Sequence, residues 1–381
     1  MKSVYLDNAA TTPMAKEVIE VMTNAMYNNF GNPSSTHAFG RSTKALLENA
    51  RRSIAKLLNC EPSEIIFTSC GTEADNMAID SAVELLGAKR IITTPIEHHA
   101  VEHTIDALVK AGKVELVHVN MNSEGIVDLA HLEQLLADTS KKTVVSLMHA
   151  NNEIGTLLPL EKVNELCKKY GAIFHSDTVQ TMGHYAFDLK KLDIDYITCS
   201  AHKFHGPKGV GFLYVNKKAK VQNLIQGGSQ ERGLRGGTEN IYGIIGLAKA
   251  LELAYTDLEA HQQHVQQIKS HMIKRLKNEL PGVEFHGTIE PEKSLYTVLN
   301  VKLPATEKGS MLLFTLDLKG VACSGGSACT AGATTGSHVL RGIKADTSRP
   351  NARFSFSRYT TIEEVDYAVD VLVEVYQNVL V

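Results

Sequence analysis

A lysine in a polar, glycine-containing segment is the residue of this chain best placed for covalent chemistry. Lys203 lies in the segment 200–209, SAHKFHGPKG, directly after a short apolar run that predicts a β-strand. A lysine that loses its charge by desolvation becomes a nucleophile and forms a Schiff base with an aldehyde. Lysines beside glycines are, however, more common in solvated loops. Taken alone, Lys203 therefore favours a loop position over a catalytic one.

Two further polar segments follow predicted strands and suit the two ends of a phosphorylated pyridine. In 175–180, HSDTVQ, Asp177 is placed to hold a ring nitrogen protonated, which makes a pyridoxal ring an electron sink. An aspartate at this point would equally well cap a helix. In 69–73, SCGTE, Gly71 permits close approach of the backbone, and the free amides of the following helix suit a phosphate. Capping by Ser69 or Thr72 is the simpler alternative.

The elements that must position these residues alternate along the chain between residues 60 and 215. Short apolar runs that predict strands are separated by segments with apolar residues at helical spacing. This alternation predicts an α/β fold with a largely parallel sheet covered by helices on both faces. Ligands of such sheets bind beyond the carboxyl ends of the strands, where Lys203 and Asp177 are expected. The strands are expected at 64–68, 90–93, 114–119, 143–148, 172–175 and 196–199, with helices at 72–86, 129–137 and 160–170.

The order of the elements changes after a long helical stretch over 241–280, which a Pro-Gly pair ends. A final helix is expected after Thr361, because Glu364 completes a capping box with it. We predict a large cofactor-binding domain and a smaller α+β domain. The large domain is expected over 16–260, and the small domain over 1–15 and 261–381, with strands at 294–301 and 352–357 and a helix at 310–318.

Composition limits the class of protein further. The 381 residues include 39 Lys and Arg and 42 Asp and Glu, a formal net charge of −3. This balance offers no basic field to collect a nucleic acid or an anionic membrane surface. No apolar run is long enough for a signal peptide or a membrane span. Six cysteines are too few for a disulfide scaffold, which favours a reducing, cytoplasmic compartment.

Ordered motifs along nearly the whole chain resemble the class V aminotransferase group of pyridoxal-phosphate enzymes and, within it, the NifS-like cysteine desulfurases. The match includes the segments around Gly71, Asp177 and Lys203. The other matching segments are YLDNAATTP at 5–13, GNPSSTH at 31–37, TPIEHH at 94–99, NNEIG at 151–155, GGSQERG at 227–233, SACT at 327–330 and RFS at 353–355. The resemblance implies a fold-type I structure, with a seven-stranded, mostly parallel sheet in the large domain.

The resemblance also implies roles for residues at the matching positions. Lys203 holds pyridoxal 5′-phosphate covalently, Asp177 pairs with its ring nitrogen, and His98 stacks on the ring and moves protons. Arg353 receives the substrate carboxylate, a task that suits its planar guanidinium. Gln180 is implied to contact the ring hydroxyl, and Asn152 and Asn32 to contact the substrate, with Asn152 also near the cofactor. The residues implied to bind the phosphate are Gly71, Thr72, Ser200, His202 and, from the second subunit of a homodimer, Thr238.

A cysteine in a loop of small residues separates a desulfurase from other enzymes of this fold. Cys329 lies in SGGSACTAG at 324–332, a composition that predicts a mobile loop but would also suit a free cysteine without a role. The resemblance implies that its thiolate attacks the sulfur of L-cysteine and retains it as a persulfide, leaving L-alanine. An acceptor protein then takes the sulfur. The resemblance implies no metal site, except that Cys329 would be able to share an iron–sulfur cluster with a scaffold partner.

Several features depart from the family pattern, among them a segment at 342–352 that is about two residues shorter than usual. Cys70 precedes Gly71 where Gly-Ala is more common, and Ser357 stands where a glycine usually follows the RFS motif. The chain ends at Val381, whereas desulfurases that serve the general iron–sulfur scaffold usually carry a longer tail. The sulfur acceptor therefore stays open between iron–sulfur cluster assembly, tRNA thiolation and a dedicated thio-cofactor pathway.

Two alternative functions retain different parts of this interpretation. A selenocysteine lyase, or another pyridoxal-phosphate lyase or transaminase, keeps the fold and the cofactor, and Cys329 is the feature that discriminates against it. A zinc metallopeptidase is the remote alternative, because His99, Glu102 and His103 fit an H-x-x-E-H pattern on one helix face. That short pattern is weakly specific and lacks a distal third ligand, so a polar helix face is the favoured explanation.

Overall fold

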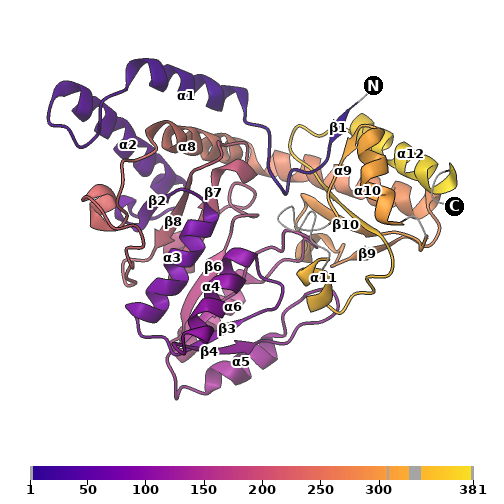
Figure 1. Cartoon of the computed structure of the whole chain (residues 1–381), viewed down its shortest axis with the longest axis horizontal. Helices are drawn as coiled ribbons and strands as arrows, with labels where there is room; N and C mark the ends of the chain where they lie inside the picture. The colour runs from indigo at the N-terminus through magenta and orange to yellow at the C-terminus, as the bar shows by residue number, and fades with distance from the viewer. Residues whose placement is uncertain (1–2, 307–308, 326–335, 379–381) are drawn as a thin grey trace.

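A seven-stranded sheet organises the larger part of the molecule (Figure 1). The computed structural model describes residues 3–306, 309–325 and 336–378, so Cys329 lies outside the described residues. All strands of this sheet run parallel except β8, which pairs antiparallel with both of its neighbours. The predicted α/β fold is thereby confirmed, although β8 itself was not predicted. The strand order is β2 (Ile65–Thr68), β8 (Gly211–Val215), β7 (Tyr196–Ser200), β6 (Ile173–Asp177), β5 (Thr143–Ser146), β3 (Arg90–Thr93) and β4 (Glu115–His118).

Helices bury both faces of this sheet. On one face α3 (Gly71–Glu84) and α4 (His99–Lys110) pack against one apolar cluster of strand residues. The other face packs against α2 (Ala38–Leu57), α5 (Leu129–Ala137), α6 (Leu160–Tyr170) and α8 (Ile241–Thr256). Because successive side chains of a strand point to opposite faces, Ile91 and Ile92 belong to different clusters. The remaining helices of this part are α1 (Lys16–Asn28) and the short α7 (Leu189–Leu192).

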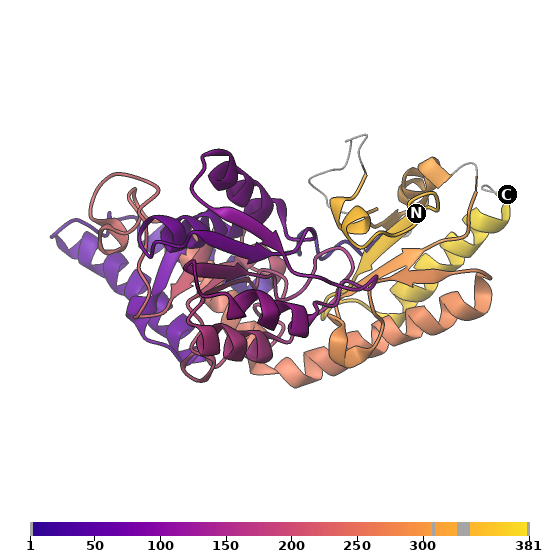
Figure 2. The same ribbon diagram turned by 90° about the horizontal axis from the view of Figure 1, so that it is seen from below.

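A three-stranded antiparallel sheet organises the smaller part, in the order β12 (Asn351–Ser355), β10 (Val298–Lys302) and β9 (Glu284–His286). Two long helices, α9 (Leu258–Glu279) and α12 (Ile362–Asn378), lie along one side of it (Figure 2). The short helices α10 (Leu312–Leu318) and α11 (His338–Gly342) complete this part. Strand β1 (Val4–Tyr5) pairs with β11 (Val321–Ala322), so the N-terminal segment lies against the smaller part. The predicted division into domains at 16–260 stays a prediction.

Two predicted elements differ from the structure. The helical stretch expected over 241–280 is broken at Asp257, whose backbone is non-helical (φ −129°, ψ 44°), so α8 and α9 are separate helices. Aspartate is a poor interior helix former, and the break lets the chain pass from the larger to the smaller part. The strand expected at 294–301 begins only at Val298. Before it, Ser294 Oγ and the Leu295 carbonyl accept hydrogen bonds from the buried Lys269 ammonium, which holds these residues in a turn.

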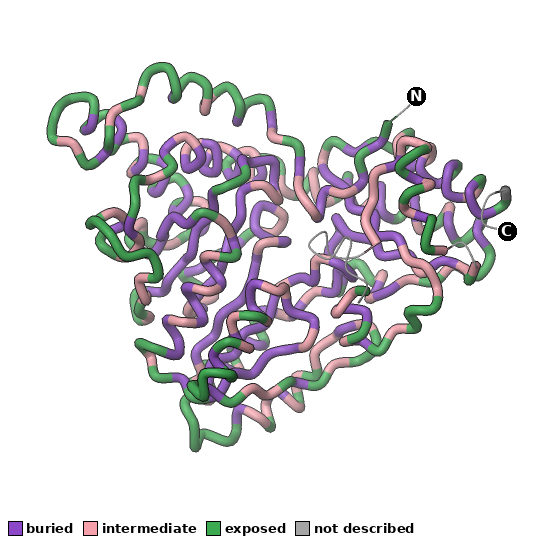
Figure 3. The backbone as a smooth tube through the Cα atoms, in the orientation of Figure 1, coloured by how far each residue is buried: buried purple, intermediate pink, exposed green. Residues whose placement is uncertain are grey.

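Burial follows this architecture (Figure 3). The strands of the large sheet are buried except for the edge strand β4, whose residues are half-buried or exposed, and α1 and the loop that follows it are largely exposed. The predicted capping box is confirmed, since Glu364 Oε2 accepts from the Thr361 amide and Thr361 Oγ1 accepts from the Glu364 amide. Within the residues that the structure describes, no helix has the length and apolar character needed to cross a membrane.

Candidate active site

A cavity of about 230 Å³ lies where the carboxyl ends of β6 and β7 meet the N-terminal ends of α3 and α4. This is the position at which sheets of this type bind ligands. Its volume is slightly below the ~300 Å³ lower limit usual for ligand pockets, which suits a small ligand. Ten of the predicted site residues line it, namely Gly71, Thr72, His98, Asn152, Asp177, Gln180, Ser200, His202, Lys203 and Arg353.

Lys203 is fixed by the N-terminal segment. It follows β7 in a single 3₁₀ turn, Ala201–Lys203, and its Nζ donates to the carbonyl oxygens of Ala9 at 2.6 Å and Ala10 at 2.9 Å. The Gln180 amide also donates to the Ala9 carbonyl, at 3.0 Å. These contacts make Lys203 a half-buried, oriented amine and not a lysine of a solvated loop. The structure therefore contradicts the solvated-loop alternative, and the catalytic role of Lys203 stays a prediction.

Asp177 ends β6 with its carboxylate in the cavity. Its Oδ1 accepts from the Val179 amide at 2.8 Å within a turn, and since the next helix begins only at Leu189, the predicted alternative of a helix cap is wrong. Burial raises the pKa of Asp177, and the nearby Asp75 carboxylate raises it further, while His98 opposes the shift. A positively charged partner in the cavity would favour the ionised carboxylate. The arrangement suits an acid that pairs with a protonated ring nitrogen.

His98 precedes α4 and caps it. Its Nδ1 accepts from the Ala100 amide at 3.2 Å, which places the proton of the neutral ring on Nε2. Burial lowers the pKa of His98, and this effect outweighs the opposing attraction of Asp177. His98 is therefore a neutral group whose Nε2–H is available to donate in the cavity.

The N-terminal end of α3 has the character of an anion site. No side chain caps this helix, whose N-cap is Cys70, so the predicted alternative of capping by Ser69 or Thr72 is wrong. The first amides of a helix have no intrahelical acceptor and carry the positive end of its dipole. A Cβ on Gly71 would meet Val179 Cγ2 at 2.6 Å, so only glycine fits here without a shift. Ser200 Cβ lies 3.6 Å from where that Cβ would be, and His202, whose Nδ1 is 3.1 Å from Thr11 Oγ1, also lines the cavity.

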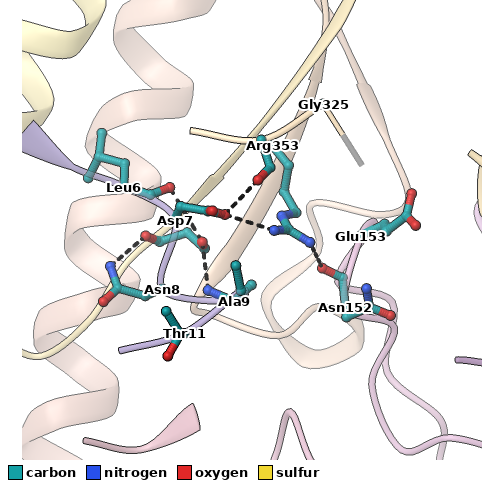
Figure 4. A network of polar contacts seen from close by, with 12 residues as sticks. Leu6, Asp7, Asn8, Ala9, Thr11, Asn152, Glu153, Gly325 and Arg353 are labelled. Carbon is teal, nitrogen blue, oxygen red and sulfur yellow. Dashed lines mark hydrogen bonds and ion pairs between the residues drawn. The ribbon is translucent and has the colours of Figure 1, made fainter. Parts of the chain in front are cut away.

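Arg353 connects the smaller part to the cavity (Figure 4). Its Nη2 donates to Asp7 Oδ1 at 2.8 Å and its Nη1 to the Asn152 carbonyl at 2.9 Å. The side chain is 1% exposed, and its Nε is buried without a hydrogen-bond partner among the described residues. Phe354 lies on the opposite face of β12 in the apolar core, as predicted. Asp7 was not identified from the sequence, because its partner is 346 residues away.

The residues present fit pyridoxal phosphate. An acid, a fixed amine, an imidazole and an uncapped helix N-terminus surround one cavity, and these are the groups that a ring nitrogen, an aldehyde, a ring face and a phosphate require. Beyond the predicted residues, the lining includes Cys70 and Val179, which lie within the recognised segments 69–73 and 175–180, and Asp75 and Met148, which lie outside the recognised segments.

Three predicted residues are not part of this lining. Asn32 is exposed in the loop between α1 and α2, and its Oδ1 accepts from the Ser34 amide. Thr238 is exposed in the segment before α8, and its predicted contact with a second subunit stays a prediction. Cys329 falls in the segment 326–335, outside the described residues.

Two of the departures from the family pattern have local consequences. Ser357 is buried in a turn in which its amide donates to Thr360 Oγ1 at 2.9 Å, and no contact with Arg353 is seen. Cys70 lines the cavity beside Gly71.

The residues of the H-x-x-E-H pattern lie on α4. His99 Nδ1 lies 2.9 Å from Glu102 Oε2, and the His99 and His103 rings stack with centroids 4.8 Å apart.

Fold and cavity together define an α/β enzyme of the aminotransferase class. A family model described as aminotransferase class-V matches residues 4–368, so the chain belongs to the class-V aminotransferase family. It is 42% identical over 382 aligned residues to cysteine desulfurase IscS of Dictyoglomus turgidum, covering 99% of this chain and 95% of that protein. Within the family, the chain therefore belongs with the cysteine desulfurases.

Solved structures agree with this assignment. A NifS-like protein superposes with a TM-score of 0.90 at 38% identity, covering 99% of this chain and all of that one. SspA, solved in complex with cysteine, superposes with a TM-score of 0.81 at 30% identity, covering 94% of this chain and all of that one. The predicted family and fold class are thereby confirmed.

Proposed function

We propose that this chain is a cytoplasmic, homodimeric, pyridoxal-phosphate-dependent cysteine desulfurase that converts L-cysteine to L-alanine and passes the sulfur to an acceptor protein. The observation that carries the proposal is the convergence of Lys203, Asp177 and Arg353 on one cavity. Cysteine bound to the related SspA structure supports the choice of substrate. The acceptor is proposed to belong to iron–sulfur cluster assembly or to a thiolation pathway for tRNA or a cofactor.

The chain's own groups divide the binding tasks. The first turn of α3 binds the cofactor phosphate, and Asp177 holds the ring nitrogen protonated. When bound, pyridoxal phosphate supplies an electron sink beside the substrate α-carbon. Arg353 orients the substrate carboxylate through its guanidinium, with the Asn152 backbone carbonyl fixing the guanidinium from one side. The substrate is thereby held with its α-carbon near Lys203.

Proton and sulfur transfer fall to three groups. Lys203 Nζ takes the α-proton, and His98 Nε2–H donates in the cavity. Cys329 Sγ, as a thiolate, attacks the substrate sulfur; the C–S bond breaks, the sulfur is retained as a Cys329 persulfide, and a proton completes the methyl group of alanine. One thiol and one cysteine thus become one persulfide and one alanine, so no further oxidant or reductant is required.

The surface of α1 and the following loop supports a homodimer. Large apolar side chains are exposed there and at the start of α2: Tyr27 is 80% and Phe30 68% exposed, and Ile19, Met26 and Phe39 are exposed as well. The Phe30 and Phe39 rings have centroids 5.2 Å apart, and exposed apolar side chains that lie together are typical of a protein interface. Thr238 is exposed as well, as it must be to contact a second subunit. Sedimentation of the Tyr27→Asp variant, expected to be monomeric, tests this part of the proposal.

A spectrum and a product assay test the reaction. The purified protein is expected to show the visible absorption of a lysine-bound pyridoxal phosphate and to form alanine and sulfide from L-cysteine. Cys329→Ala is expected to abolish alanine formation and keep the absorption. Cys323→Ala is the matched control, because burial raises the pKa of Cys323 to about 12 and makes it a poor nucleophile.

Other outcomes point to other reactions. Full alanine formation by Cys329→Ala would indicate a lyase, and turnover of L-selenocysteine far above that of L-cysteine would indicate a selenocysteine lyase. Absence of the visible absorption after incubation with pyridoxal phosphate would contradict the cofactor assignment.

A further inference from the structure

A cluster of metal-ligating side chains lies beside the active site but outside its cavity. His99 and Glu102 come from the first turn of α4, and His338 begins α11. One ligand atom from each lies within 4.8 Å of the others, and all three residues are partly buried. The His99 and His338 rings have centroids 4.3 Å apart. Two helices from distant parts of the sequence thus meet through groups that commonly bind zinc.

The hydrogen bond of His338 determines which of its ring nitrogens is free. Its Nε2 lies 2.8 Å from the Glu97 carbonyl oxygen, which can only accept, so Nε2 carries the proton. Nδ1 of the neutral ring then keeps its lone pair. This Nδ1 is buried and has no hydrogen-bond partner among the described residues. A histidine fixed by a backbone carbonyl through one nitrogen and bare at the other is the usual arrangement of a metal ligand.

His99 and Glu102 already lie in direct contact, with His99 Nδ1 2.9 Å from Glu102 Oε2. Without a metal, a single proton is shared between these two atoms. A metal ion that replaces this proton would be held by the imidazole nitrogen and the carboxylate oxygen together. His103 stacks on His99 but contributes no atom to the group of three. The H-x-x-E-H spacing therefore does not define the ligands, since the distal histidine comes from α11.

We propose that His99, Glu102 and His338 form a site for one divalent transition-metal ion of the zinc class. Two imidazoles and one carboxylate suit zinc better than calcium or magnesium, which prefer oxygen ligands alone. Three protein ligands leave one position for water. A bound ion would connect α4 to α11 and would give the buried Nδ1 of His338 a partner. Because metal binding needs the folded chain, the ion is expected to raise the temperature of unfolding.

Metal titrations of the pyridoxal-phosphate-loaded, chelator-treated protein test the site. Equilibrium dialysis with zinc is expected to show one tight site in the unaltered protein and at least a tenfold weaker site in His338→Ala and Glu102→Gln. His103→Gln is the matched control within the cluster and should bind zinc like the unaltered protein. The Co²⁺ form should show visible d–d absorption without the sulfur-to-cobalt charge-transfer band that cysteine ligands would produce.

The outcomes are separable from folding and from desulfurase activity. Equal zinc affinity in the unaltered protein and in Glu102→Gln and His338→Ala, or a sulfur-to-cobalt band, would overturn the proposal. The side chain of Glu102 is 37% exposed, so Glu102→Gln is expected to fold, as the unfolding temperature of the metal-free protein will verify. Dialysis counts bound metal directly, so its result does not depend on the reaction that the enzyme catalyses.

Discussion

Arg353 already has two partners in the described structure, and this limits how a substrate carboxylate can reach it. The guanidinium donates to Asp7 and to the Asn152 carbonyl, and Arg353 lines the cavity. Asp7 in turn accepts from Ser324 Oγ at 2.9 Å. Ser324 begins the small-residue segment in which Cys329 lies. The Arg353 guanidinium is therefore linked, through Asp7, to the side-chain hydroxyl at the start of that segment.

Replacing the guanidinium of Arg353 by an ammonium group should affect substrate binding more than turnover. In Arg353→Lys we expect the KM for L-cysteine to rise about tenfold, the equivalent of about 1.4 kcal/mol, because a point charge replaces a two-pronged donor. The change in kcat should be smaller. Steady-state kinetics of alanine formation measure both. Arg349→Lys is the control, since Arg349 contacts Glu284 and backbone carbonyls away from the cavity.

Removing the amine of Lys203 should abolish the reaction. For Lys203→Ala we expect turnover to fall at least about a thousandfold, because both covalent attachment and α-proton transfer are lost. The visible absorption should change to that of free pyridoxal phosphate, which gel filtration then removes. Lys208→Ala, at an exposed position five residues further on, should be unaffected. Normal alanine formation by Lys203→Ala would contradict the assigned role.

At the scale of the element, the N-terminal end of α3 packs directly against the loop after β6, beside the proposed phosphate position. Gly71 lies at that contact, and a methyl group there would overlap with Val179 Cγ2. Glycine is required at this position because there is no room for a side chain, and not because of its backbone conformation, since Gly71 has no positive φ.

Gly71→Ala should therefore destabilise the protein, and a second substitution should rescue it. Overpacking of this kind costs about 1–3 kcal/mol, so the free energy of unfolding in urea should fall by this amount. Val179→Ala removes the clashing methyl and should restore most of the loss in the double variant. A loss in the double variant equal to the sum of the single losses would show that the clash is not the cause.

Local elements could be predicted from sequence where a periodic pattern and a cap coincide. The helices at 129–137 and 160–170 and the capping box of Thr361 and Glu364 were predicted correctly. The break at Asp257 was missed, because one weak helix former within a long apolar-periodic stretch is normally tolerated. The antiparallel β8 was missed because a buried strand of five residues has no distinguishing period.

For the site, recognisable motifs indicated most of the residues that line the cavity, including Lys203, Asp177 and Gly71. What motifs could not indicate are contacts that depend on how distant segments pack. Asp75, Met148 and the Asp7 side chain reach the site through tertiary structure alone. The same holds for the meeting of His99 with His338.

At the scale of the whole molecule, buried neutral histidines should make the fold sensitive to acid. Burial lowers the pKa of six histidines to about 4, so between pH 6.5 and about 4.5 the unfolded chain binds protons that the folded chain does not. The free energy of unfolding should fall over this interval, each such group contributing at most about 1.4 kcal/mol per pH unit. The six are His149, His175, His184, His202, His205 and His286.

Three buried acids oppose this trend without reversing it. Burial raises the pKa of Asp75 and Glu97 to about 8 and that of Asp177 to about 6, which favours the folded state at lower pH, but these acids are fewer than the histidines. His175 Nε2 and Asp75 Oδ1 lie 3.3 Å apart, and leaving this pair out does not change the sign of the expected pH dependence of stability. Urea unfolding at pH 6.5, 5.5 and 4.5 measures the slope, and His149→Asn should reduce it while the exposed His118→Gln should not. Stability that is constant or rises on acidification would contradict the prediction.

The segment from Asp7 to Thr12 has a consequence for how the enzyme is assembled during synthesis. Asp7 contacts Arg353, Ala9 contacts Lys203, and Thr12 donates to the His202 carbonyl, so this short strip of chain holds both halves of the site in register. Its partners are made long after it, the last of them 346 residues later. Ala9 and Thr12 can reach their partners once the large sheet and the turn after β7 have formed, whereas Asp7 gains its partner only after Arg353 has been made. The strip is therefore fixed to the larger part before it is fixed to the smaller one, and the contact with Arg353 comes last.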